Sequence, residues 1–580
     1  MLACSLAILC LGSPGVRLET PEVALSHEDL TQADLREFLK QRAGGEKAAP
    51  AAWRKSDPIL AQARALEDQI LLNAALWRLE GDEKAKMRAL EALENTASVP
   101  MGGVEDVLGN AELIASMALG YDGLKDQMEP SQREALLKRI QTRGLEWSLE
   151  QESSKAFWTT NWRNSSVVIR SCMALAAALT HKDNLELSNQ VLQSWRENVP
   201  KMQGYFGLNG GSSEGLVYWM FVLNYAALAD EAVSKAKGEA FAPRVTDRAD
   251  ALYPVMLDGP SGKLYNFGDS IEDVVPAAAL MFISKQQEKP AAAAWTREVL
   301  RDVISRPSAY TNAQLRFLPF ALQWWNDAAG DDSALPLAKL YSGDDTVGVM
   351  RSSWSDPRAA FAAFVAGDRQ ASHSQIDLGS FIYEANGVRW AVDPGMDSGP
   401  GYFDAKPEGR RWQFFRPSAF GHSLLQVGGQ AQSPKSSARV TRFGTGKNPF
   451  GIVDLSPSYG LSPGSYKRGF KLVGDSLLIQ DEIPDSAFDS MWRMISEAEA
   501  SNQNGSFVLR KDGQTLHVKF LGGGRRDSVI QQGPGKMQVG RSADSLLSLE
   551  FKVKAGTRRI AVLLTPDEGE SQDLQPLSEW

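Results

Sequence analysis

The densest group of residues that could do chemistry runs from His373 to His422. In chain order it reads H-S-Q-I-D-L-G-S-F, A-V-D-P-G, G-Y-F-D, R-R-W-Q-F-F-R and G-H-S-L-L. Imidazole titrates near neutral pH, so His373 is a candidate general base, although a structural histidine bonded to a neighbouring loop fits the same pattern. The planar guanidinium forks of Arg410 and Arg411 can bind a carboxylate or a sulfate bidentately, or brace a hairpin. The segment predicts proton transfer on an anionic substrate.

Tyrosine is the second residue type in these motifs that can move protons. Its ordinary pKa of about 10 can be lowered by nearby cations or hydrogen-bond donors, which makes it useful as an acid and as a base. Tyr218 stands in E-G-L-V-Y-W and Tyr402 in G-Y-F-D. The alternative for Tyr218 is packing inside a helix beside Trp219 and Tyr225. We expect Tyr218 and Tyr402 to be catalytic.

The elements that carry Tyr218 follow a helical pattern from about residue 28 to 327. Val168, Cys172, Leu175 and Leu179 recur at steps of four, three and four, which places them on one face of a helix. Similar amphipathic stretches recur through this half of the chain. Many helices in series are typical of an (α/α) toroid, an inference that rests on fold analogy.

After Ser342-Gly343-Asp344-Asp345 the hydrophobic period changes from 3.6 to 2. Residues 381–392 predict a hairpin, because Asn386-Gly387 supplies the two positive-φ residues of a type I′ turn. That register pairs Glu384 with Arg389 and Tyr383 with Trp390. The second half is therefore predicted to be rich in antiparallel strands and to form a β-sandwich.

The predicted fold class is multidomain α+β, an N-terminal (α/α) toroid followed by an antiparallel β-sandwich. We place the toroid at residues 21–335 and the sandwich at 336–580, since 580 residues exceed one core. Residues 1–20 begin with a short apolar run followed by small residues, typical of a secretory signal remnant, although a buried strand is the alternative. The run is too short to span a bilayer, so no integral membrane segment is expected in the mature chain.

Composition excludes several classes of protein. The formal net charge of −9 argues against a general nucleic-acid binder, but a local cationic cleft could still hold an anionic glycan. Of the three cysteines, Cys4 and Cys10 lie in the predicted signal, which leaves Cys172 alone and predicts no intramolecular disulfide in the mature chain. A phosphate-binding G-x-x-x-x-G-K-[ST] loop does not occur.

Together the motifs resemble the heparinase II/III family of polysaccharide lyases. Its β-domain carries H-x-H-x-D-x-G-S-F, then D-x-G, then G-H-N. In the helical half, G-Y-D at 120–122, T-N-W at 160–162, E-G-x-x-Y-W at 214–219 and N-F-G-D-S at 266–270 are similar to that family as well. The order and spacing of these matches over residues ~110 to ~430 make chance agreement improbable.

The resemblance implies an exported, periplasmic or secreted enzyme that cleaves a uronate polysaccharide by β-elimination. A base removes the C5 proton, an acid protonates the departing O4, and polar donors neutralise the uronate carboxylate. By family position Asn161 binds that carboxylate, while Tyr218, Tyr402 and His373 share proton transfer. Trp162 stands where many relatives have histidine. The remaining expected substrate-binding residues are Trp162, Arg163, Asn164, Glu214, Arg410 and Arg411.

In relatives a divalent metal, usually zinc, is held at positions that match Gln375, Asp393 and His422. The amide of Gln375 is a departure, because zinc favours imidazole, thiolate and carboxylate. The site is therefore expected to bind zinc weakly, to bind a harder cation, or to be empty. Asp377 is a substitute ligand, and a buried hydrogen-bond network is the alternative to a metal site.

Three rival functions remain open. A uronyl C5-epimerase would share the fold and the carbanion. A non-catalytic glycan-binding protein is favoured by the missing histidines at positions 162 and 375. A toroid glycosidase would need two cleft carboxylates, which Glu214 and Asp269 could supply. The sequence leaves open which uronate polymer is bound, whether cleavage is endo or exo, and the oligomeric state.

Overall fold

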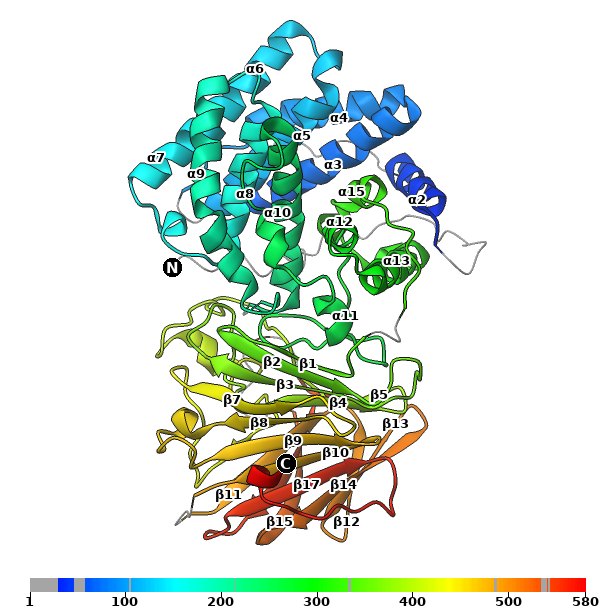
Figure 1. The fold of residues 1–580 in the computed structure, drawn as a ribbon, viewed down its shortest axis with the longest axis vertical. Helices are drawn as coiled ribbons and strands as arrows, with labels where there is room; N and C mark the ends of the chain where they lie inside the picture. Colours follow the sequence, from blue (N-terminus) through cyan, green and yellow to red (C-terminus); the bar gives the residue numbers. More distant parts are fainter. Residues whose placement is uncertain are drawn as a thin grey trace.

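The computed structural model describes residues 30–45, 58–103, 106–212, 214–331, 335–484, 488–533, 540 and 543–580. Helices form one half of the molecule and strands the other (Figure 1). The last helix ends at Gln323 and the first strand begins at Ala338, so the change from helices to strands falls between them. The predicted signal remnant lies outside the described residues.

The helical half is an (α/α) toroid built around four helices that pack in series. These are α3 (Ile59–Glu80), α5 (Val107–Leu124), α8 (Asn164–Leu179) and α10 (Leu216–Lys237). The periodic residues of α8 are buried as predicted except Leu179, which is half-buried. The opposite face of α8 is buried too, because α5 and α10 flank it. An inner helix of a toroid has little solvent-facing side, so it is apolar nearly all round.

Other helices surround these four. The flanking helices α4 (Glu83–Asn95) and α9 (Leu185–Gln203) each keep one polar, exposed face. The remaining helices are α2 (Gln32–Gly45), α6 (Pro130–Ile140), α7 (Trp147–Ser153), α11 (Tyr253–Leu257), α12 (Ala279–Gln286), α13 (Pro290–Ser305), α14 (Asn312–Leu315) and α15 (Leu318–Gln323). Among the described helices α10 is long and apolar enough to cross a membrane, but 94% of its most apolar stretch is buried inside the protein, as in a core helix.

The second half is an antiparallel β-sandwich. Its larger sheet has the order β1-β2-β3-β7-β8-β9-β10-β17-β14-β13-β12, with the β4–β5 hairpin paired to β3, and its smaller sheet has the order β15-β16-β11-β6. Apolar side chains from both sheets meet in one core, where Trp492 of β11 packs against Phe381 of β4 and Phe551 of β16.

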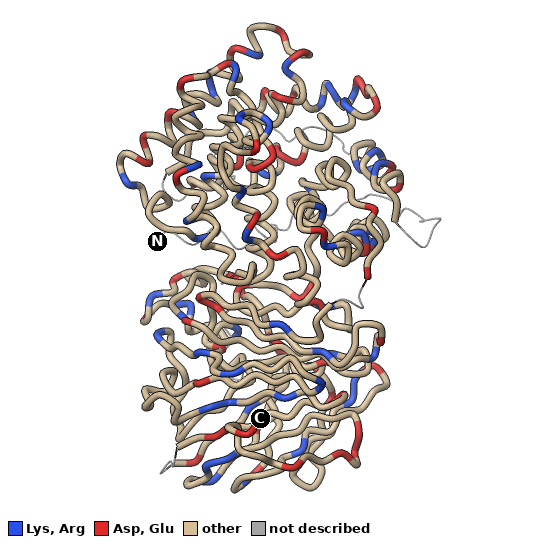
Figure 2. Tube along the Cα trace, viewed as in Figure 1, with Lys and Arg blue, Asp and Glu red and all other residues tan. Residues whose placement is uncertain are grey.

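The strands are β1 (Ala338–Tyr341), β2 (Asp345–Arg351), β3 (Phe361–Asp368), β4 (Phe381–Ala385), β5 (Val388–Ala391), β6 (Leu425–Gln426), β7 (Ser437–Gly444), β8 (Phe450–Asp454), β9 (Lys467–Val473), β10 (Ser476–Glu482), β11 (Ser490–Ser496), β12 (Glu499–Gln503), β13 (Ser506–Lys511), β14 (Gln514–Gly522), β15 (Arg525–Gln532), β16 (Leu547–Val553) and β17 (Arg559–Thr565). Lys and Arg are interspersed with Asp and Glu over both halves of the molecule (Figure 2).

The predicted hairpin is confirmed, with one correction in its register. Asn386 and Gly387 have φ values of 55° and 75°, as a type I′ turn requires. Glu384 pairs with Arg389 as expected. Tyr383 pairs with Ala391 rather than with Trp390, because an irregularity between Tyr383 and Glu384 shifts the register by one residue.

The same hairpin fastens the sandwich to the toroid. Glu384 Oε2 accepts a hydrogen bond from the backbone N–H of Ser261 at 2.8 Å, and Arg389 Nη1 donates to the carbonyl of Leu264 at 2.8 Å. Both partners belong to the toroid loop that follows α11. Side chains presented by the rest of this loop are therefore held at a fixed place against the sandwich.

Candidate active site at the junction of toroid and sandwich

The ring of Tyr218 lies against the imidazole of His373. Tyr218 is in the first turn of α10, whereas His373 belongs to the loop that follows β3. The ring centroids are 3.9 Å apart and the ring planes are inclined by 19°, so the rings are stacked. Tyr218 is 1% exposed and the His373 side chain 10% exposed. Two predicted proton-transfer residues, one from each half of the molecule, therefore meet.

Asp269 connects His373 to the rest of the site. Its carboxylate, on the toroid loop between α11 and α12, accepts from His373 Nδ1 at 3.0 Å and from Arg411 Nη2 at 2.7 Å. It also accepts from the Tyr402 hydroxyl and from Gln375 Nε2 at 3.3 Å. All four donors come from the sandwich. Asp269 is fully buried, so this carboxylate holds the β-domain part of the site from the toroid side.

The charges around Asp269 keep it ionised. Burial alone would raise the pKa of its carboxyl group, but the Arg411 guanidinium and His373 outweigh burial and hold the pKa well below its ordinary value. Burial raises the pKa of Tyr402 far above its usual range, with Arg411 opposing and Asp269 adding to the rise. Tyr402 therefore keeps its hydroxyl proton and donates a hydrogen bond to the Asp269 carboxylate.

Two sequence-based expectations differ from this geometry. Tyr402 was expected to transfer protons to and from a sugar, but its hydroxyl donates a hydrogen bond to Asp269. Arg411 was expected to bind substrate, but it is 2% exposed, and its guanidinium bonds Asp269 and the carbonyl of Ser374, the latter at 2.9 Å. Both side chains therefore form hydrogen bonds within the protein. Arg410, by contrast, is exposed next to them.

Asn161 lies in the turn just before α8. Its Nδ2 donates to the carbonyl of Phe157 at 2.7 Å, and its Oδ1 accepts from Ser166 Oγ at 2.6 Å and from the backbone N–H of Arg163 at 3.2 Å. The predicted carboxylate binder is thus half-buried at the helix end.

The four neighbouring toroid candidates differ in their exposure to solvent. Arg163 is exposed, and Trp162 is half-buried with the charged ends of Arg170 and Lys201 each 5.3 Å from its ring centre. Asn164 and Glu214 are both 2% exposed and joined, since the Asn164 backbone N–H donates to Glu214 Oε2 at 2.9 Å.

Asn164 and Glu214 also retain unused acceptor atoms. Within the described ranges, Asn164 Oδ1 and Glu214 Oε1 have no hydrogen-bond partner. Buried acceptors without partners are rare in proteins and commonly indicate a bound group or water. These two atoms therefore fit the predicted substrate-binding role better than Arg411 does.

A second cluster, which we term the carboxylate–histidine cluster, consists of Asp377, Asp393 and His422. Ligand atoms from the three buried residues lie within 4.8 Å of one another. His422 Nδ1 is 3.6 Å from Asp393 Oδ2. Asp377, the expected substitute ligand, thus lies beside Asp393 and His422, and its other carboxylate oxygen pairs with Arg369.

Several atoms of this cluster have no hydrogen-bond partner among the described residues. They are both ring nitrogens of His422, Oδ2 of Asp393 and Oδ2 of Asp377. Burial raises the pKa of Asp377 to about 6 and that of Asp393 well above its ordinary value, and it lowers the pKa of His422 to about 3. Each shift disfavours the charged form of the side chain, because burial removes the charge from water.

Gln375 uses only the nitrogen of its amide in hydrogen bonds, and its buried Oε1 has no hydrogen-bond partner among the described residues. Its Nε2 donates to the carbonyl of Gly268 at 2.7 Å as well as to Asp269 and to the carbonyl of Gly395. The amide therefore ties the toroid loop to the sandwich. The Gln375 nitrogen thus belongs to a buried hydrogen-bond network, and the carboxylates and imidazole of Asp377, Asp393 and His422 are donor types that divalent metals take.

Sequence reasoning did not assign Asp269 its place at the centre of the site. It considered Asp269 only as one carboxylate of a glycosidase pair, because the partners of Asp269 lie more than 100 residues away in the chain. The usable signal was the N-F-G-D-S turn itself, where a glycine at φ +63° precedes the aspartate.

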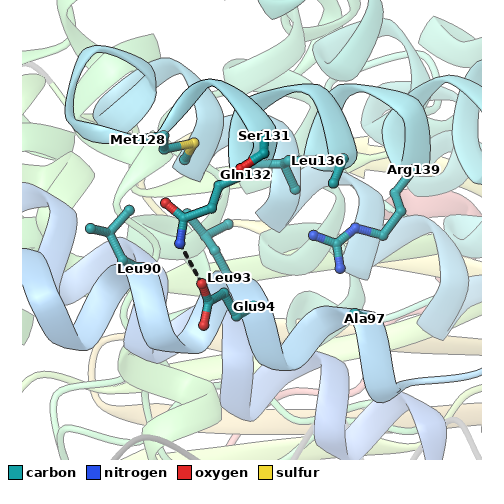
Figure 3. A pocket seen from close by; sticks show the side chains of 10 residues that line it. Leu90, Leu93, Glu94, Ala97, Met128, Ser131, Gln132, Leu136 and Arg139 are labelled. Atoms are coloured by element: carbon teal, nitrogen blue, oxygen red, sulfur yellow. Dashed lines mark hydrogen bonds between the residues drawn. The ribbon is translucent and has the colours of Figure 1, made fainter.

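Hollows elsewhere carry little of this chemistry. A cavity of about 330 Å³ lies between α4 and α6, at the end of the toroid away from the sandwich (Figures 1 and 3). Its walls are mainly Leu90, Leu93, Met128 and Leu136, with Gln132 donating to Glu94 at 2.5 Å. Tyr218, His373 and Asp269 lie at the opposite end of the toroid, where it meets the sandwich.

Comparisons with known proteins agree with this architecture. Residues 359–563 match the family model "Heparinase II/III-like, C-terminal". Heparan sulfate lyase HepC from Pedobacter heparinus has a similar structure, with 16% identity over 96% of this chain and 86% of that one and a TM-score of 0.58. A structure titled heparinase III has 14% identity over 97% and 89% of the two chains and a TM-score of 0.60. No curated protein sequence matches the chain.

At such identities the structural likeness establishes the fold, a toroid followed by a sandwich, along nearly the whole chain. The family model covers the segment that holds His373, Gln375, Asp393, Tyr402 and His422. Residues 359–563 therefore resemble the C-terminal domain of heparinase II/III-like proteins, in agreement with the resemblance recognised from the sequence motifs.

Proposed function

We propose that the protein is a polysaccharide lyase that cleaves a uronate-containing polymer by β-elimination. The observation that carries the proposal is the stack of Tyr218 on His373 at the junction of toroid and sandwich, with His373 Nδ1 bonded to Asp269. A tyrosine and an oriented imidazole in contact supply the acid and the base that this reaction needs. The fold shared with heparan sulfate lyase structures supports the same class of chemistry.

In the proposed reaction His373 Nε2 takes the proton from C5 of the uronate. The electron pair left at C5 forms the C4–C5 double bond as the C4–O4 bond breaks. The Tyr218 hydroxyl supplies the proton that the departing O4 takes up. The unsaturated sugar and the new chain end are the two products, and water afterwards restores the protonation states of both side chains.

Donors to the uronate carboxylate make the C5 anion tolerable. Asn161 is half-buried at the start of α8, and one of its two Nδ2 hydrogens is used on Phe157. The other hydrogen can serve the carboxylate. Exposed Arg163 and Arg410 offer further cationic donors for an anionic polymer, and we retain them as substrate-binding residues.

Asp377, Asp393 and His422 would hold a divalent metal, for which zinc is the best fit to the resemblance. Their buried, unpartnered donor atoms support this assignment. The metal would supply charge compensation and hold the loops of the sandwich in place. We assign it no step of the elimination.

An activity screen on a panel of uronate polymers tests the proposal. β-Elimination should give a product that absorbs in the ultraviolet and whose two fragments sum to the mass of the uncleaved chain. Hydrolysis would instead add one water to that sum. A C5-epimerase would leave the chain length and the absorbance unchanged and would exchange the C5 proton with solvent. Binding of polymers without any of these changes would identify a glycan-binding protein and overturn the proposal.

A further inference from the structure

Asp269 belongs to the toroid, yet every side chain that bonds its carboxylate belongs to the sandwich. We propose that Asp269 is the positioning residue of the active site, which fixes the tautomer and the orientation of His373 across the junction. The inference rests on the proposed function for its catalytic consequence. The tautomer itself can be measured without any substrate.

The hydrogen bond decides which imidazole nitrogen carries the proton. Asp269 is ionised and can only accept, so His373 Nδ1 must donate across the 3.0 Å contact. In the neutral imidazole Nε2 is then the nitrogen with a free lone pair. A base at Nε2 is thus prepared before substrate arrives. When Nε2 takes the C5 proton, the neighbouring carboxylate stabilises the imidazolium that forms.

The backbone of the same loop holds His373 a second time. The Asp269 N–H donates to the carbonyl of His373 at 3.0 Å. His373 has φ +63°, a left-handed conformation that residues other than glycine adopt uncommonly. Gly268, just before Asp269, would place a Cβ 3.1 Å from that carbonyl, which explains glycine at this position. Backbone and side chain of one toroid loop together fix one β-domain histidine.

The geometry also separates Asp269 from the role that a glycosidase would give it. A general acid must hold a proton, but the Arg411 guanidinium and His373 keep this carboxyl group ionised. The residue is fully buried and four donors surround its carboxylate. Asp269 therefore acts on substrate through His373 and not as the general acid of a hydrolytic pair.

Nitrogen NMR of the imidazoles tests the tautomer directly. The chain has five histidines, and His373→Gln identifies the signals of His373 by difference. In the unmodified protein we expect the neutral imidazole of His373 to carry its proton on Nδ1 and none on Nε2. Protonation of Nε2 with a bare Nδ1 would overturn the proposal, whatever any variant does.

Asp269→Asn supplies the second part of the test, with Asp273→Asn as the matched control on an exposed residue of the same loop. We expect Asp269→Asn to shift the His373 signals toward a mixture of tautomers and Asp273→Asn to leave them unchanged. On a substrate from the panel, kcat should fall by about 100-fold with KM changed less than about threefold. Asp269→Glu, which restores a carboxylate, should recover part of the loss and covers the case in which the asparagine variant does not fold.

The outcomes of this test are separable from those of the proposed function. Wild-type kcat together with unchanged imidazole signals in Asp269→Asn would overturn the positioning role. If no polymer is cleaved by the unmodified protein, the proposed function fails, and the NMR result still decides whether Asp269 sets the tautomer.

Discussion

Two buried polar clusters lie side by side in this protein, and they differ in how well their own hydrogen bonds are satisfied. Asp269 is surrounded by four donors, all of which come from the other half of the molecule. Asp377, Asp393 and His422 lie within the sandwich and retain donor and acceptor atoms without partners in the described part of the chain. Gln375 stands between the two, and its amide nitrogen bonds the first cluster.

The difference separates positioning from binding. A buried network whose members are all bonded is rigid and fixes the side chains that it holds. Buried polar atoms without partners cost free energy, so a folded protein retains them where something else completes them. We therefore infer that the Asp269 cluster orients reacting groups and that the carboxylate–histidine cluster receives a cation. Each cluster can be perturbed separately.

The largest expected effect is on His373. His373→Gln removes the base while keeping a side chain of similar reach, and turnover should fall by about 10³-fold because general base catalysis is lost. The initial rate of formation of ultraviolet-absorbing product measures this. His181→Gln, at a half-buried position on the toroid surface, is the control and should be silent. A His373→Gln enzyme with more than a tenth of the normal rate would remove His373 from the chemistry.

The two tyrosines should respond differently to the same substitution. Tyr218→Phe removes the hydroxyl expected to protonate O4, and turnover should fall by about 100-fold with little change in melting temperature. Tyr402→Phe removes a hydroxyl that bonds only Asp269 among the described residues, so turnover should fall by less than about 10-fold. Equal losses in both variants would show that the buried Tyr402 reaches the substrate after all.

The carboxylate–histidine cluster should respond to chelators in stability more than in rate. Metal that binds only the folded state stabilises it by mass action, so EDTA should lower the melting temperature by several degrees, on the order of 5 °C. Asp377→Asn should abolish that response and lower the metal content. Asp512→Asn, an exposed turn residue of the sandwich, is the control. An unchanged metal content in Asp377→Asn would return the ligand role to Gln375.

The smallest expected effect comes from the toroid interior, far from both clusters. Burial raises the pKa of Glu67 from its ordinary value of 4.5 to about 7, although Arg316 opposes the rise. The folded state therefore holds this proton more tightly than the unfolded chain does. Its stabilising contribution is complete below pH 4.5 and is lost as the pH rises through about 7.

Glu67→Gln mimics the protonated acid and should flatten that part of the stability curve. Melting temperatures of the two proteins measured from pH 4.5 to 8 should diverge by roughly 2 °C. The Tyr225 hydroxyl and Arg316 Nε, each 2.8 Å from Glu67, keep an acceptor in the variant. Parallel curves would mean that Glu67 is ionised throughout this range, as its pairing with Arg316 favours.

The fold could be predicted from the sequence because its signals are local. The spacing of Val168, Cys172 and Leu175 indicates a helix, and Asn386-Gly387 indicates a hairpin, without knowledge of any distant residue. The pairing of Tyr383 escaped prediction because the irregularity that shifts it leaves no mark in the alternation of side chains.

The candidate site was predicted only in part, because its bonds are long-range. Tyr218 and His373 were proposed separately, and the structure brings them together. Tyr402 and Arg411 are residue types suited to catalysis and binding, but both side chains hydrogen-bond to Asp269 inside the protein. Gln375 was predicted as a ligand with Asp377 as its substitute, and the structure places Asp377 beside Asp393 and His422.

We infer that one buried cluster orients the reacting groups while its neighbour binds a metal. A paired measurement on two variants tests this assignment most directly. Metal content by elemental analysis and the initial rate of product absorbance would be determined on the same preparations of His373→Gln and His422→Gln. We expect His373→Gln to keep its metal and lose its rate. We expect His422→Gln to lose its metal and, well below its melting temperature, to keep a rate within about 10-fold of normal. Loss of both properties in each variant, or the reverse pattern, would contradict the assignment of the two clusters.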